Sequence, residues 1–194
     1  MPRVKEFNET DVLEKAVNLF HTKGYNATSA QDLVDELGIS RSSLYDTFGD
    51  KRSLFLKALQ HYRSTASKAM IEMVNNSTNI EETIKLIFKT AIKEAIEDKL
   101  SKGCFMVNAT IELAPHDKDV AEIINQNMAD VENALCLAIK KGQNEGLFTE
   151  NQTALSLSRF VFNNISGLRV ASKSGAEKKV FEDIVKVTLS ALKD

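Results

Sequence analysis

A chain of 194 residues that is 43% hydrophobic and 27% charged has the composition of a folded globular protein, which excludes a disordered one. The sequence has no apolar run long enough to cross a bilayer and no secretory signal at its N-terminus, so we expect a cytoplasmic protein with no membrane partner. The net charge of −2 excludes attraction to nucleic acid by overall charge alone.

The first predicted helix begins near Asn8 and ends at Gly24. Its inward face consists of apolar residues at helical spacing, namely Leu13, Ala16, Val17 and Phe20. We expect this helix to pack beneath the two short helices that follow it in the chain.

Those two short helices are joined by the break Gly38-Ile39-Ser40. A capping box is expected to start the first of them, formed either by Thr28 with Gln31 or by Ser29 with Asp32. Gly38 marks its end, because glycine readily takes the left-handed conformation that closes a helix. Ser40 is then a good N-cap for the second helix.

The second short helix is expected to expose a polar face. Leu44 and Phe48 are four residues apart and face inward, which leaves a hydroxyl-rich side outward. A short helix with such an exposed polar face is typical of the recognition helices that bind in the DNA major groove. Arg41, at its start, could reach a guanine edge, and the free N–H groups that open the preceding helix could attract a phosphate through Thr28, Ser29 and Gln31.

Four segments resemble the N-terminal domain of the TetR family, namely residues 16–20, 23–29, 37–40 and 43–51. The resemblance implies a ligand-responsive transcriptional repressor that binds a palindromic double-stranded DNA operator as a homodimer and is released by a small-molecule inducer. It assigns base contacts to Gln31, Arg41 and Ser42, and contacts with the DNA backbone to Ser43, Tyr45, Thr47 and Lys51. The role of Asp46, an acid near the expected DNA face, stays open.

The charge of this N-terminal part constrains how it could bind DNA. Residues 1–63 contain nine Lys or Arg and nine Asp or Glu, so the cations must be placed asymmetrically. We expect few phosphate contacts per subunit and a moderate dependence of binding on salt. The cations expected to face the groove are Arg3, Lys5, Arg41, Lys51 and Arg52.

The rest of the chain also reads as helices, which predicts an all-α fold of about nine helices. We expect a three-helix helix-turn-helix DNA-binding domain over residues 1–50 and a helical ligand-binding and dimerisation domain over residues 51–194. The expected later helices cover residues 51–74, 80–95, 104–113, 117–141, 152–172 and 176–192, with Gly142 and Gly146 ending the fourth of these.

The last two predicted helices carry more apolar residues than one packed face requires. A two-fold packing of these helices against a second copy would cover the surplus, although they could instead lie at the centre of the monomer. The candidate dimer-interface residues are Phe160, Asn164, Gly167, Leu168, Phe181, Ile184 and Val185.

Soft and aromatic side chains of the middle helices could line an inducer pocket or could be ordinary core. Cys104, Asn108 and Glu112 recur every four residues along one helix edge, where a ligand or neighbouring helices must satisfy them. Residues 103–114 resemble a TetR subgroup with a Gly-Cys motif. The candidate ligand-binding residues are Met70, Met73, Phe88, Cys104, Phe105, Asn108, Glu112 and Met128.

Two other classes of function remain as alternatives. Cys104 follows Gly103 at an expected helix start, where the helix dipole favours a thiolate, so a redox- or electrophile-sensing regulator is one. A helical ligand or interaction module that does not bind DNA is the other. An enzyme is not expected, because no catalytic constellation appears, and no metal or other cofactor is expected, because His21, His61 and His116 fall in separate elements.

Overall fold

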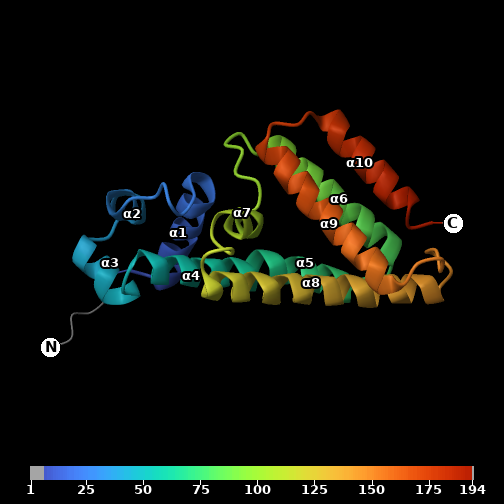
Figure 1. Ribbon diagram of the computed structural model, residues 1–194, viewed down its shortest axis with the longest axis horizontal. Coiled ribbons are helices and arrows are strands. Elements are labelled where there is room, and N and C mark those ends of the chain that lie inside the picture. The colour runs from blue at the N-terminus through green and yellow to red at the C-terminus, as the bar shows by residue number, and fades with distance from the viewer. Residues whose placement is uncertain (1–6, 194) are drawn as a thin grey trace.

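The computed structural model describes residues 7–193, and every regular element in that range is a helix (Figure 1). In chain order these are α1 (Glu9–Lys23), α2 (Ala30–Leu37), α3 (Arg41–Phe48), α4 (Lys51–Tyr62), the π-helical segment η1 (Arg63–Ser67), α5 (Lys68–Asn75), α6 (Ile80–Glu97), α7 (Phe105–Glu112), α8 (Lys118–Asn144), α9 (Ala154–Lys173) and α10 (Lys178–Ser190). Counted with α4, η1 and α5 as one continuous run, the described residues form nine helices. The predicted all-α fold is confirmed.

Local capping signals place the first helices as predicted. Asn8 accepts a hydrogen bond from the Thr10 N–H at the start of α1, at 2.9 Å. Of the two capping boxes considered for α2, Ser29 with Asp32 is the one that forms. Gly38 ends α2 in the left-handed conformation, with φ of 69°, and the Ser40 side chain then caps α3.

Two apolar clusters hold the chain together. One is formed by α1, α2, α3 and α4 together with residues of α7 and the first turns of α8, among them Phe105, Met106 and Val120. The other fills the space between α5, α6, the rest of α8, α9 and α10. Because α8 contributes to both clusters, it connects the two ends of the elongated molecule, with α1 to α3 at one end and α10 at the other (Figure 1).

The sequence suggested that Gly142 helps to end α8, but it does not. The helix continues to Asn144, and Gly146, with φ of 70°, follows it. A Cβ built on Gly142 would lie 2.4 Å from Cδ2 of the buried Phe148. Gly142 is therefore required for the close approach of Phe148 to the helix and not for its termination.

The predicted long helix over residues 51–74 contains a change of helix type. α4 passes into the π-helical segment η1 at Arg63 and continues as α5 from Lys68. Segments of π-helix inside α-helices occur frequently at functional sites. This one contributes Ala66 and Ser67 to the wall of a cavity described below.

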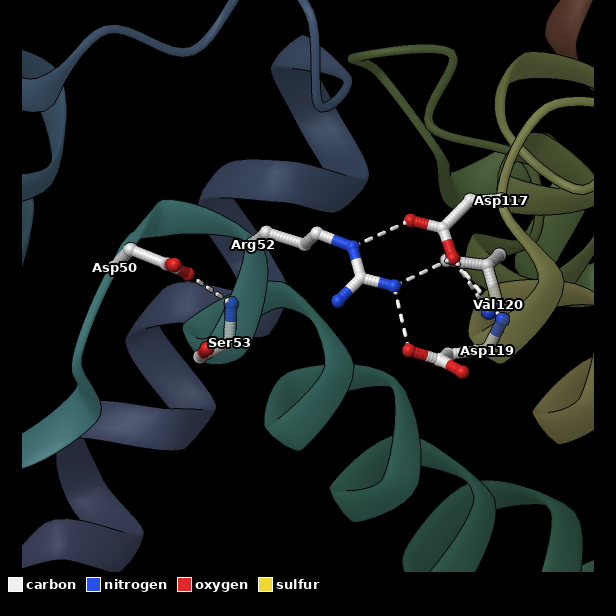
Figure 2. A network of polar contacts seen from close by, with 6 residues as sticks. All are labelled: Asp50, Arg52, Ser53, Asp117, Asp119 and Val120. Carbon is white, nitrogen blue, oxygen red and sulfur yellow. Dashed lines mark hydrogen bonds and ion pairs between the residues drawn. The ribbon is translucent and has the colours of Figure 1, made fainter.

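Arg52 joins the start of α4 to the start of α8 (Figure 2). Its guanidinium donates to both carboxylate oxygens of Asp117, at 2.7 and 2.8 Å, and to Asp119 at 2.6 Å. Asp117 is also the N-cap of α8, and its bonds with Arg52 lower the pKa of its carboxyl group. The prediction that Arg52 faces the DNA groove is therefore wrong, because two acids that are distant in sequence hold it.

α7 is attached to α1 and to the loop after α1 by a polar contact at each of its ends. Nε2 of His21 lies 3.2 Å from the Gly103 carbonyl oxygen, just before α7. At the other end, the Glu112 carboxylate accepts the backbone N–H groups of Tyr25, at 3.0 Å, and Asn26, at 2.7 Å. These bonds fix α7 against the helix that supports α2 and α3.

His21 makes this attachment sensitive to pH. Burial lowers the pKa of His21, which packs against the rings of Tyr62 and Phe105. The unfolded chain therefore binds a proton more readily than the folded chain, and stability falls as the pH drops below about 6.5, the ordinary pKa of histidine.

We predict that the thermal midpoint decreases between about pH 7.5 and pH 5.5, and that this decrease is smaller in His21→Gln. Thermal melts followed by circular dichroism would measure both. His116→Gln, at an exposed histidine, is the matched control and should keep the full pH dependence. Equal pH dependence in His21→Gln and wild type would contradict this role.

Candidate nucleic-acid interface and ligand cavity

The outward side of α3 is polar and rests on a buried footing. Leu44 and Phe48 are buried, as predicted, while Arg41 and Ser42 are exposed at the start of the helix. The Arg41 guanidinium carbon lies 5.9 Å from the centre of the Tyr45 ring. This contact holds a cation and a phenol together on the exposed face, which suits contact with DNA.

The hydroxyl groups beside Arg41 are organised by the helix cap. Ser40 Oγ lies 3.0 Å from Ser42 Oγ and 2.9 Å from Ser43 Oγ. Lys51 is the first residue of α4, which follows α3 in the chain, and its ammonium lies 4.4 Å from the centre of the Tyr25 ring. Thr47 is half-buried and Asp46 is exposed. The DNA contacts assigned to Ser42, Ser43, Tyr45, Thr47 and Lys51 stay predictions.

The start of α2 already holds an anion. The Asp32 carboxylate accepts from Ser29 N–H at 2.7 Å and lies 2.6 Å from Lys23 Nζ, and these bonds lower the pKa of Asp32. A phosphate at this helix end would have to approach that carboxylate. Gln31 is exposed, and its side-chain amide donates a hydrogen bond to Asp35 at 2.7 Å. This bond would have to break before Gln31 could contact a base.

Thr28 requires a correction. Its side chain is buried, and its hydroxyl donates to the Gly24 carbonyl oxygen at 2.5 Å, so it is not available to DNA. Thr28 instead closes the turn that follows α1. Arg3 and Lys5, which were expected to face the groove, lie outside the described residues.

A cavity of about 280 Å³ lies between the π-helical segment, α5, α6, α8 and α9. Three of the eight candidate ligand-binding residues line it, namely Met70, Met73 and Cys104. Its wall is mainly apolar, with the aromatic ring of Phe162 and the side chains of Ile87, Val131 and Ile165. A small apolar molecule would fit there.

The other five candidates do not line this cavity. Phe88 and Phe105 belong to the two apolar clusters, and Met128, 43% exposed, faces solvent. Asn108 donates to the Lys102 carbonyl oxygen at 2.8 Å, and Glu112 binds the loop after α1. Neighbouring backbone groups therefore satisfy both polar side chains without a ligand.

The exposed side of α9 and α10 is partly apolar. Phe160 is 40% exposed, and nothing lies within 4 Å of a Cβ built on Gly167. Asn164 is half-buried, and Ile184 and Val185 are half-buried against the core. Leu168 and Phe181 are each 1% exposed, so their assignment to a dimer interface is wrong: they belong to the core of the monomer.

Two family descriptions match this sequence. "Bacterial regulatory proteins, tetR family" matches residues 12–58, and "Tetracyclin repressor-like, C-terminal domain" matches residues 81–186, more than half of the chain. The chain belongs to the TetR family. The recognition made from the N-terminal motifs is confirmed at this level.

Relatives within the TetR family extend over nearly the whole chain. The "Uncharacterized HTH-type transcriptional regulator YezE" of Bacillus subtilis is 33% identical over 193 residues, which cover 99% of this chain and 100% of that protein. The "HTH-type transcriptional repressor ComR" of Escherichia coli is 28% identical over 188 residues, 96% of this chain and 90% of ComR. No helix in the described range could cross a membrane.

Two solved structures support the same fold. A cysteine mutant of the TetR family regulator CifR, complexed with double-strand operator DNA, superposes with a TM-score of 0.84 at 22% identity, covering 97% of this chain and 99% of that chain. The "E.coli NemR reduced form" superposes with a TM-score of 0.81 at 16% identity, covering 96% of each chain.

Most cavity residues of this TetR-family protein were not identified from the sequence, among them Tyr62, Asn127 and Arg169. Tyr62 and Arg169 come from α4 and α9, and Asn127 comes from α8. Of these three, only Asn127 carried a local signal, because it lies four residues after Ile123 and four before Val131, within the buried stripe of its helix. Leu155, Val170, Val180 and Val187 are further exposed apolar residues of α9 and α10 that were not among the candidate interface residues.

Proposed function

We propose that this protein is a ligand-responsive, DNA-binding transcriptional repressor that acts in the cytoplasm. Residues 1–50 bind the operator, and residues 51–194 bind a small molecule and a second copy of the chain. The observation that carries the proposal is the exposed polar face of α3, with Arg41 beside Tyr45 on a buried footing, in a chain of the TetR family. Relatives named as repressors and the operator complex of CifR support it.

The position of the cavity supports a mechanism of release. Tyr62, Ala66 and Ser67 lie on its wall, at the junction of α4 with the π-helical segment, and α4 begins directly after α3. An inducer that binds one arrangement of this junction better than the other shifts α3 relative to the body. In a dimer, this shift changes the spacing of two recognition helices, which must be about 34 Å apart to reach successive major grooves.

A direct binding measurement tests the proposal. The DNA upstream of the protein's own gene, labelled with a fluorophore, is titrated with the purified protein, and anisotropy reports binding at several salt concentrations. We expect saturable binding that weakens with salt to a moderate degree. Failure to bind this DNA in preference to unrelated duplex would favour the helical interaction module, and affinity independent of salt would contradict the few phosphate contacts proposed.

We further propose that α9 and α10 pack against the same helices of a second copy. The exposed Phe160 and the open surface at Gly167 support a self-complementary contact of this kind. Phe160→Glu is predicted to convert the dimer into a monomer and to weaken operator binding, because both half-sites must be bound together. Sedimentation velocity measures the oligomeric state.

The matched control is Leu137→Glu, which places the same charge at an exposed leucine of α8. It should remain dimeric and bind DNA as wild type does. A monomeric wild-type protein, or a Phe160→Glu variant that stays dimeric at the same concentration, would contradict this interface.

One observation favours a second candidate, in which a thiol controls DNA binding. Cys104 lines the cavity, with its sulfur 3.9 Å from the Tyr62 hydroxyl. Under this candidate, alkylation or oxidation of Cys104 would weaken DNA binding in wild type and in Cys136→Ser but not in Cys104→Ser. An unreactive Cys104 in the folded protein would eliminate it. The resemblance of residues 103–114 to a Gly-Cys subgroup belongs to this candidate.

A further inference from the structure

Asn127 places a polar group without a protein partner in the wall of the cavity. The residue is 6% exposed and lies on the buried stripe of α8, between apolar residues one turn away on either side. No protein group in the described structure donates a hydrogen bond to its Oδ1 atom. Buried polar groups in proteins nearly always have a partner. Because Asn127 lines the cavity, rotation of its side-chain amide would turn this unpartnered oxygen toward a donor there.

The cavity has no net charge to offer a ligand. Its cation, Arg169, lies 2.5 Å from the carboxylate of Glu94, which also lines the cavity. Burial raises the pKa of another titratable wall residue, Tyr62, so its phenol is neutral at physiological pH. A charged ligand would have to break the ion pair or remain unpaired in a largely apolar space.

Size restricts the ligand further. The cavity of about 280 Å³ is small among ligand pockets, although a core cavity of about 150 Å³ is enough to hold benzene in another protein. The methionines Met70 and Met73 and the ring of Phe162 are suited to contact with an aromatic or branched aliphatic group. The space therefore fits one ring with a short substituent.

We infer that the cavity binds a neutral, ring-sized, mainly apolar molecule with one hydroxyl or N–H donor, and that Asn127 Oδ1 accepts the hydrogen bond of that donor. This inference rests on the proposed function, because it names the chemical class of the inducer. Specificity arises from Asn127: a ligand of the same shape without a donor leaves the buried amide oxygen unpaired.

Three para-substituted probes test the inference by isothermal titration calorimetry on the purified protein. Para-ethylphenol carries the donor, para-ethylanisole lacks it, and para-ethylbenzoate is an anion. We expect para-ethylphenol to bind about tenfold more tightly than para-ethylanisole, and para-ethylbenzoate to show no binding. No binding of para-ethylphenol, equal binding of the two neutral probes, or tightest binding of the anion would overturn the inference.

Asn127→Leu removes the acceptor and keeps the approximate volume. In this variant the two neutral probes should bind equally, and the unliganded protein should melt about 2–4 °C higher, because an unpaired buried amide is replaced by an apolar group. Ser166→Ala removes a different polar group of the cavity wall and should keep the preference for the phenol. A preference lost in Ser166→Ala but kept in Asn127→Leu would assign the donor site elsewhere and overturn the inference.

The same preparations separate this inference from the proposed function. Operator binding by the unliganded wild type and by Asn127→Leu is measured by anisotropy and does not depend on any probe. A protein that binds operator DNA but shows no preference for the phenol retains the proposed function and loses the inference. A protein that prefers the phenol but binds no operator DNA retains the ligand specificity assigned to the cavity and loses the proposed function.

Discussion

Replacing Arg41 and Lys51 together by alanine is expected to lower operator affinity about a hundredfold. Arg41 lies exposed at the start of α3, and Lys51 lies at the start of the following helix, over the Tyr25 ring. Loss of a base contact weakens binding by about 1–3 kcal/mol, and loss of a phosphate contact adds to this. Neither side chain is buried, so the fold should be unaffected.

Fluorescence anisotropy with operator DNA measures this effect, and circular dichroism checks the fold. The matched control is Lys89→Ala with Lys93→Ala, which removes two cations from exposed positions on α6. The control should bind within about twofold of wild type, because charge far from DNA contributes little at physiological salt. Equal losses in both double variants would show that net charge, and not the face of α3, controls binding.

The two single variants separate the roles of these residues. Arg41→Ala should reduce the discrimination between operator and unrelated duplex, because a base contact carries sequence information. Lys51→Ala should weaken binding to both DNAs equally and reduce the slope of log K against log salt by about 1. If Lys51→Ala altered sequence preference and Arg41→Ala did not, the assignment of the two roles would be reversed.

The second large effect is expected at Glu112, which connects α7 to the loop after α1. Its carboxylate accepts two backbone N–H groups, and the first turns of α7 contribute Met106 and Val107 to the cavity wall. Charge-assisted bonds of this kind are each stronger than neutral ones. Glu112→Ala should destabilise the protein by about 2 kcal/mol and lower the thermal midpoint by about 4–8 °C.

Glu112→Ala should also weaken the response of DNA binding to a cavity ligand, because one connection between the cavity wall and the DNA-binding helices is lost. Thermal melts and anisotropy titrations with and without ligand measure the two effects. Glu112→Gln keeps the shape but has one acceptor oxygen in place of two, so an intermediate loss of stability is expected. Glu150→Ala, at an exposed acid, should change neither property, and wild-type stability in Glu112→Ala would contradict the connection.

Sequence alone identified the features that depend on neighbours in the chain. The caps at Ser29 and Ser40 follow from side chains that bond within three residues, and the turn at Gly38 follows from the left-handed conformation that glycine readily takes. The inward position of Leu44 follows in the same way from helical spacing. Motifs of this kind occupy most of the DNA-binding part, which explains why its fold and family could be predicted.

Features that depend on distant partners could not be predicted. Arg52 has the appearance of a free cation until Asp117, 65 residues later, is placed beside it. Glu112 has the appearance of a ligand contact until the N–H groups of Tyr25, 87 residues earlier, are placed against it. The same limit applies to Phe181, because an apolar residue has the same helical spacing whether it faces the monomer core or a second subunit.

The sharing of one apolar cluster by α1 to α4, α7 and α8 has a consequence for dissecting the molecule. A recombinant peptide ending at residue 50 would lose the apolar surface that Leu54, Phe55, Phe105 and Val120 provide to the inner sides of its helices. Burial of such surface is the main source of stability in small domains. Residues 1–50 are therefore not expected to fold when transferred alone to another protein. A chimera would have to include α4, α7 and the first turns of α8 as well.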